Sequence, residues 1–195
     1  MKKIVLLSLF IVAGFWQHDQ NRVIDHEPGV LVRSKPVQRN LVSAAPIVYK
    51  GYEILPQADF TVEARVLSRE KYYFDESAEL SPLDLALGWG PMSDSAVIDK
   101  LDIEQSVRFY TWRMERSPIS LAEVIRHSSN MHMIPANEQV AEQLAAVRTG
   151  NLVTIQGKLV NIRSAKGFSW NSSMSRTDTG AGACEVIYVT GVQKL

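Results

Sequence analysis

The sequence predicts an α+β fold, with a mixed or antiparallel sheet, short helices and C-terminal strands that resemble a small barrel. Apolar and polar residues alternate over Phe60–Leu67, as in a half-buried strand. Asn137 is a good N-cap for a helix over Glu138–Arg148, whose apolar residues share one face. A long strand pattern over Leu152–Ile162 is interrupted by Gly157, which favours a bulge or a barrel corner.

The N-terminus has the pattern of an export signal. Lys2 and Lys3 precede an apolar run of 13 residues, Ile4–Trp16. At 1.5 Å per residue the run spans roughly 20 Å, less than the ~30 Å hydrocarbon core. We expect residues 1–16 to be a signal peptide, or an uncleaved anchor in the inner membrane, with the rest of the chain on the periplasmic side. A buried N-terminal helix of a cytosolic protein is the alternative.

Residues 17–58 are expected to form an extended stalk across the domain, because prolines deny backbone donors to a sheet. Short strands are expected at Val30–Val32 and Ile47–Tyr49. Residues 59–195 then form a single α+β globular domain. The prolines of the stalk are Pro28, Pro36, Pro46 and Pro56.

The middle of the chain has two helix-start signals. A helix over Pro82–Leu87 is expected because Ser81 is a good N-cap and proline is favoured at the first helical position. A second short helix, capped by Ser93 or Asp94, should continue through Ile98–Leu101.

Alternating strand and helix patterns follow. Ile103–Trp112 is predicted as one strand, and Ser120–Glu123 is a capping box that should start a short helix. Asn130–Ile134 has the composition of a strand.

The last quarter of the chain resembles part of an OB-fold barrel. The resemblance rests on the order of three predicted strands, of which the first is long and bent. These strands are Leu152–Ile162, Gly167–Asn171 and Cys184–Val192.

Composition excludes some classes of partner and chemistry. Lysine plus arginine equals aspartate plus glutamate, 21 each, so no basic surface for nucleic acid is expected. The single cysteine, Cys184, can form no internal disulfide and lacks the neighbours of a zinc site. We expect it to be a core residue; an intermolecular disulfide or a reactive thiol is the alternative.

Asp178-Thr179-Gly180 matches the triplet of aspartic proteases, but we interpret it as a turn. A protease triplet follows an apolar strand and needs a second carboxylate, whereas polar residues precede Asp178. Aspartate and threonine in turns hydrogen-bond to their own backbone. The surrounding loop is rich in hydroxyls, and Ser173, Arg176 and Asp178 are candidate contacts for an anion or a sugar.

Two histidines and one tryptophan are further candidates. His127 and His132 are five residues apart and would bind a metal only if other ligands converged on them. Packing within the fold is the alternative for both. Trp89 lies between two glycines, and an exposed ring there would suit a sugar or a partner protein.

Several long motifs resemble a group of uncharacterised exported or membrane-anchored bacterial proteins. The resemblance spans most of the chain. It implies an envelope location and supplies no activity, cofactor or catalytic residue. Besides the basic-apolar start, the motifs are His26–Leu31, Leu85–Asp94, His127–Ala136 and Trp170–Glu185.

The sequence therefore predicts a non-catalytic binding or assembly module of the cell envelope. The partner would be an envelope protein or a small ligand, with no nucleic acid, no cofactor, no metal and no catalytic residue assigned. The alternative is a periplasmic hydrolase or metal-dependent enzyme that uses His127 and His132 with Asp94 or Asp178. The predicted binding residues are Trp89, His127, His132, Trp170, Ser173, Arg176 and Asp178.

Overall fold

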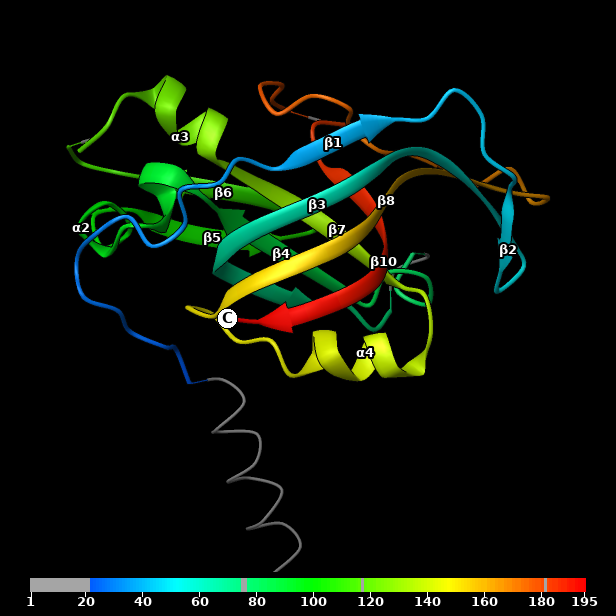
Figure 1. Ribbon diagram of the computed structural model, residues 1–195, viewed down its shortest axis with the longest axis horizontal. Coiled ribbons are helices and arrows are strands. Elements are labelled where there is room, and N and C mark those ends of the chain that lie inside the picture. Colours follow the sequence, from blue (N-terminus) through cyan, green and yellow to red (C-terminus); the bar gives the residue numbers. More distant parts are fainter. Residues whose placement is uncertain (1–21, 75–76, 117, 181) are drawn as a thin grey trace, which may run out of the picture.

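The computed structural model describes residues 22–74, 77–116, 118–180 and 182–195, and they form a closed barrel with added strands and short helices (Figure 1). The predicted α+β class is confirmed. The large sheet contains β1 (Val37–Asn40), β2 (Ile47–Tyr49), β3 (Tyr52–Lys71), β4 (Leu83–Gly88), β7 (Ser128–Pro135), β8 (Leu152–Ser164), β9 (Ser169–Asn171) and β10 (Glu185–Lys194). A separate hairpin consists of β5 (Asp102–Ser106) and β6 (Phe109–Arg113), and the helices are η1 (Gly90–Ser93), α2 (Ser95–Ile98), α3 (Leu121–His127) and α4 (Glu138–Ala145).

Five strands close the ring in the order β3, β4, β7, β10 and β8, because β8 also pairs with β3. All pairs in the ring are antiparallel except β7 with β10. This order is that of a five-stranded Greek-key barrel of the OB type. The barrel is larger than the sequence indicated, because its first strand is β3 and the C-terminal strands are its fourth and fifth.

Alternate residues of each ring strand point into one continuous core. The twenty-residue β3 contributes Ala58 to Val66 at every second position, which explains the alternation seen in the sequence. Helix α4 covers one end of the barrel, where Val140 and Leu144 pack into the core (Figure 1). Asn137 caps this helix as predicted, by accepting a hydrogen bond from Val140 N, although the helix ends at Ala145.

The predicted helix over Pro82–Leu87 is wrong, because this segment is strand β4. Leu83, Leu85 and Leu87 face the barrel core, and Ala86 faces a second apolar cluster outside it. A strand that is buried on both faces is nearly all apolar, and the one acid here, Asp84, is too little to reveal a period of two. Helices α2 and α3 and the β5–β6 hairpin contribute to the outer cluster.

The segment before the barrel lies against it. Val30–Val32 is not a strand; instead, Leu31 N and Val32 N donate to Ser93 Oγ. The range expected as a stalk contains β1, β2 and the start of β3. The predicted export segment, residues 1–16, lies outside the described residues. No helix within the described ranges is both long and apolar enough to span a membrane.

Candidate functional site

The β5–β6 hairpin leaves one strand edge unpaired. The predicted single strand over Ile103–Trp112 is wrong, because Val107–Arg108 forms a two-residue turn with positive φ at both positions, 49° and 68°. This is the geometry of a type I′ turn, whose flanking residues form a hydrogen-bonded pair. Since such pairs alternate along the ladder, the backbone N–H and C=O groups of Tyr110 and Trp112 point away from β5. No described strand pairs with this edge.

The open edge of β6 forms one wall of a cavity of about 350 Å³, which we call the hairpin pocket. Four consecutive β6 residues line it, so the strand presents its edge rather than one face. The other lining residues are Ile125 on α3, Ser128–Asn130 on β7, and Asp178–Gly180, Ala183 and Cys184 in the loop before β10.

The facing segment of β7 is also paired on one side only. β10 pairs with β7 from Met131 onward, so Ser128–Asn130 have a described strand partner only in β4. Tyr110 Oη donates to Ser128 Oγ at 3.3 Å. Burial raises the pKa of Tyr110 to about 12, so its hydroxyl remains a donor at neutral pH.

Arg108 fixes the hairpin to the barrel. Its guanidinium donates to Asp84 Oδ1 and to Ser81 O, each at 2.9 Å, and lies 3.7 Å from the centre of the Tyr72 ring. Arg108 N donates to Tyr72 Oη at 3.0 Å, and Asn130 Nδ2 donates to Arg108 O at 3.0 Å. These contacts hold the β6 edge at a fixed distance from β7.

His132 and Trp170, two of the predicted site residues, lie together beside the Arg108–Asp84 ion pair. His132 Nδ1 is 2.9 Å from Asp84 Oδ1, and the centres of the His132 and Trp170 rings are 4.6 Å apart. His132 is only 3% exposed, so its contacts are with the fold and not with solvent.

His127 and Trp89 lie elsewhere. His127 Nδ1 is 2.9 Å from Glu123 O, one turn earlier on α3. Trp89 is 1% exposed and belongs to the barrel core, so its ring is not accessible as the sugar or partner contact that the sequence suggested. The glycines that suggested a loop flank a tryptophan that follows directly after β4.

The Asp178-Thr179-Gly180 triplet lies in a loop, and Gly180 has a φ of 85°. Ser173 Oγ donates to Asp178 Oδ2 at 2.7 Å and accepts from Ser175 N at 3.0 Å. The hydroxyls of this loop therefore stabilise its own backbone, and of the seven predicted residues only Asp178 lines the hairpin pocket.

Arg176 connects the same loop to a buried carboxylate at the mouth of the barrel. Arg176 Nε is 2.5 Å from Glu185 Oε1, and Ser129 donates to Glu185 Oε2. Arg176 also donates to Gln38 Oε1 at 2.9 Å, and its guanidinium lies 5.3 Å from the centre of the Phe60 ring. Burial raises the pKa of Glu185 to about 7, although Arg176 and Ser129 both lower it.

We expect Glu185 to make stability fall as pH rises. The folded protein holds the Glu185 proton more tightly than the unfolded chain does between pH 4.5 and about 7. The shift corresponds to on the order of 3 kcal/mol, present below pH 4.5 and lost as pH rises through about 7. Urea unfolding across this range should show the slope in wild type and in the exposed control Glu79→Gln, but not in Glu185→Gln. An unchanged slope in Glu185→Gln would contradict the assignment.

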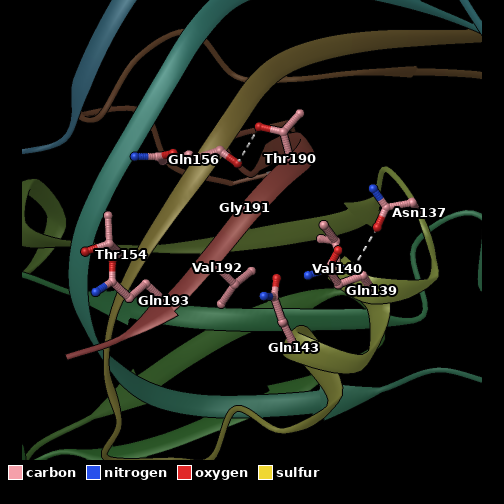
Figure 2. Close-up of a pocket in the computed structure, with 10 residues that line it drawn as sticks. All are labelled: Asn137, Gln139, Val140, Gln143, Thr154, Gln156, Thr190, Gly191, Val192 and Gln193. Atoms are coloured by element: carbon pink, nitrogen blue, oxygen red, sulfur yellow. Dashed lines mark hydrogen bonds between the residues drawn. The ribbon is translucent and has the colours of Figure 1, made fainter.

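A second cavity, of about 290 Å³, lies between α4 and strands β8 and β10 (Figure 2). We call it the amide groove, because Gln139 and Gln143 of α4 and Gln156 and Gln193 of the sheet line it; the side chains of Gln156 and Gln193 extend away from α4. None of its ten lining residues is ionisable.

No described group of three or more His, Cys, Asp or Glu residues converges in a way that could hold a metal ion. Cys184 lines the hairpin pocket, but burial raises the pKa of its thiol to about 11. Because the thiolate is the nucleophilic form, this raised pKa lowers the reactivity of the thiol at neutral pH.

Sequence reasoning missed the residues that build the site. Asp84 and Glu185 are each 0% exposed, and both appear in the sequence as a single acid inside an apolar strand pattern. An acid inside an apolar strand pattern is a readable signal, because a buried charge requires a partner and so indicates a buried ion pair or hydrogen bond. The unpaired edge of β6 had no such signal, since Val107–Arg108 lacks the Asn-Gly or Asp-Gly of common two-residue turns.

No family model, curated protein or solved structure matches this chain.

Proposed function

We propose that this chain is a non-catalytic binding module of the bacterial cell envelope, whose hairpin pocket takes an extended peptide segment of a partner protein. One observation carries the proposal: the unpaired edge of β6 lines a cavity. An unpaired strand edge offers a row of donors and acceptors that an added strand satisfies, which is the basis of recognition by strand addition. The envelope location rests on the basic-apolar start of the sequence.

The lining of the pocket indicates what such a segment would carry. Phe109, Trp112 and Ile125 provide apolar contacts, and Phe109 is 49% exposed. Ser128 and Ser129 of β7 also line the pocket. In a strand, alternate side chains face one way, so the segment would present small apolar residues toward Phe109 at every second position.

Selection of displayed random peptides on the full chain tests the proposal. Enriched peptides should bind wild type and lose at least about tenfold in affinity for Ala183→Trp, which fills the pocket. Thr177→Trp is the matched control, because Thr177 is exposed in the same loop and does not line the pocket.

A second test of the same proposal uses the backbone amides of the selected peptide. N-methylation of alternate amides on one edge should abolish binding, and methylation on the other edge should not. Peptides that bind Ala183→Trp as tightly as wild type, or that tolerate methylation on both edges, would contradict the proposal.

A further inference from the structure

The amide groove lies at the end of the barrel away from the hairpin pocket. It is lined by the last residues of β10 and by α4, which follows β7, whereas the hairpin pocket is lined by the start of β7 and the loop before β10. Since β7 and β10 are parallel, the two cavities are at opposite ends of these strands. The chain is 22% charged, so a lining of ten residues would ordinarily include about two charges; the groove has none.

Four of the chain's nine glutamines line the groove, on both of its walls (Figure 2). Over the described ranges, none of their side-chain amides has a hydrogen-bond partner within the chain, so all are available to a ligand. Each amide offers donors and an acceptor, the same combination that a hydroxyl group offers in return. Thr154, Thr190 and Asn137 extend this neutral polar lining.

The floor of the groove is apolar and is formed at a bulge in β10. The register between β10 and β8 shifts between Val189 and Gly191, which leaves Thr190 as the extra residue. Val192 forms the accessible apolar part, since Val140 is only 4% exposed, and Gly191 adds no side chain to the lining. A Cβ atom at Gly191 would meet only Gln156, at 3.7 Å.

The ten lining residues disfavour other classes of ligand. An anion would lose hydration without gaining a cation, and a metal ion would find no carboxylate or imidazole in the lining. An added peptide strand would find no open edge, because Thr154 and Gln156 of β8 are already paired with both β3 and β10.

We propose that the amide groove binds an uncharged oligosaccharide, with the sugar hydroxyls bonded to the glutamine amides and a sugar C–H face on Val192. Its volume is close to the lower limit of small-ligand sites, roughly 300 Å³, which suits a short segment of such a chain. A neighbouring hollow that shares Gln139, Gln143 and Gln193 continues the groove along α4 toward Glu142 and Lys194. This site does not depend on the function proposed for the hairpin pocket.

Titration of the ¹⁵N-labelled full chain with chitotriose and with cellotriose tests the proposal, and trigalacturonic acid is the charged comparison. At least one uncharged trisaccharide should shift the side-chain NH₂ signals of Gln139, Gln143, Gln156 and Gln193 saturably, and the charged trimer should not. Gly191→Met should weaken binding at least about tenfold by filling the floor. Val48→Met adds the same side chain at a position of β2 that is 82% exposed, and should bind as wild type does.

The double variant Gln143→Ala/Gln193→Ala removes two amides without adding volume, and it replaces Gly191→Met if that variant does not fold. Absence of shifts with both uncharged trisaccharides would overturn the proposal. So would equal binding of the charged trimer, or full affinity in the groove variants.

Discussion

Replacement of Asp84 by alanine is expected to lower the free energy of unfolding by about 3–5 kcal/mol, because it leaves the largely buried Arg108 guanidinium without its carboxylate. Asp84 is 0% exposed, and its Oδ1 atom lies 2.9 Å from both the Arg108 guanidinium and His132 Nδ1. The side chains of Arg108 and His132 are themselves only 15% and 4% exposed, so water cannot replace the lost charge. Urea denaturation measures the effect.

Asp102→Ala is the matched control. Asp102 pairs with Arg113 on the same hairpin, at 3.1 Å, but the two side chains are 60% and 70% exposed. An exposed pair contributes at most about 1 kcal/mol. If Asp84→Ala and Asp102→Ala cost the same, Asp84 does not hold the hairpin in the way described.

The Arg108–Asp84 ion pair should also link the stability of the hairpin to peptide binding at the hairpin pocket. Arg108 reaches Asp84 from the turn of the hairpin, so loss of Asp84 should free the β6 edge before the barrel opens. Hydrogen exchange in Asp84→Ala should therefore increase first in β5 and β6 and only later in β7 and β10. Peptide binding at the hairpin pocket should weaken in the same variant.

The elements that the sequence predicted correctly have local causes. Asp94, Ser120 and Asn137 each cap a helix through a side-chain oxygen that accepts a backbone N–H two or three residues later. Such signals depend on a few adjacent residues, and tertiary contacts did not override them. The alternation over Phe60–Leu67 was equally readable, because β3 has one face in the core and a less buried face outside.

The errors have non-local causes. β4 was read as a helix because its outer face is covered by a layer that only the folded chain brings there, so Leu83–Leu87 has a single polar residue, Asp84, in place of a polar face. Ser81 and Pro82 are favourable at a helix start, but burial between two apolar clusters outweighs propensity. The ring itself closes through pairing of β3 with β8, which begins about eighty residues after β3, and no local pattern encodes that pairing.

The candidate site was predictable only in part. His132, Trp170, Arg176 and Asp178 were singled out, and the structure places each against a partner from another element or within its loop. Their partners Asp84 and Glu185 were not singled out, because each looks like a minor interruption of an apolar strand. The pocket itself depends on an unpaired edge, a property of strand pairing that a sequence does not display.

Gly157→Ala is expected to cost about 3 kcal/mol, the upper end of the usual cost of overpacking, because the barrel has no room for a single added carbon at this point. A Cβ atom here would lie 2.3 Å from Tyr188 O and 3.0 Å from Ile187 Cγ2, and the first of these is backbone. Gly157 pairs with Phe60 of β3 and Val189 of β10, so neither neighbouring strand can move without breaking the ring. The sequence indicated a bulge or a corner at this glycine, and the bulge is in the partner strand β10.

Gly191→Ala makes the test specific. It applies the same chemical change in the adjoining strand, where the nearest atoms to the added carbon are 3.7 and 4.0 Å away and belong to the Gln156 side chain. Both substitutions reduce the entropy of the unfolded chain equally, by about 0.4–1 kcal/mol, so the difference between them reports the steric conflict alone. We expect Gly191→Ala to unfold in urea within about 1 kcal/mol of wild type. Equal stability of the two variants would mean that β8 and β10 separate easily at the bulge. The closed ring would then not be a rigid element that holds the hairpin pocket and the amide groove at opposite ends of the barrel.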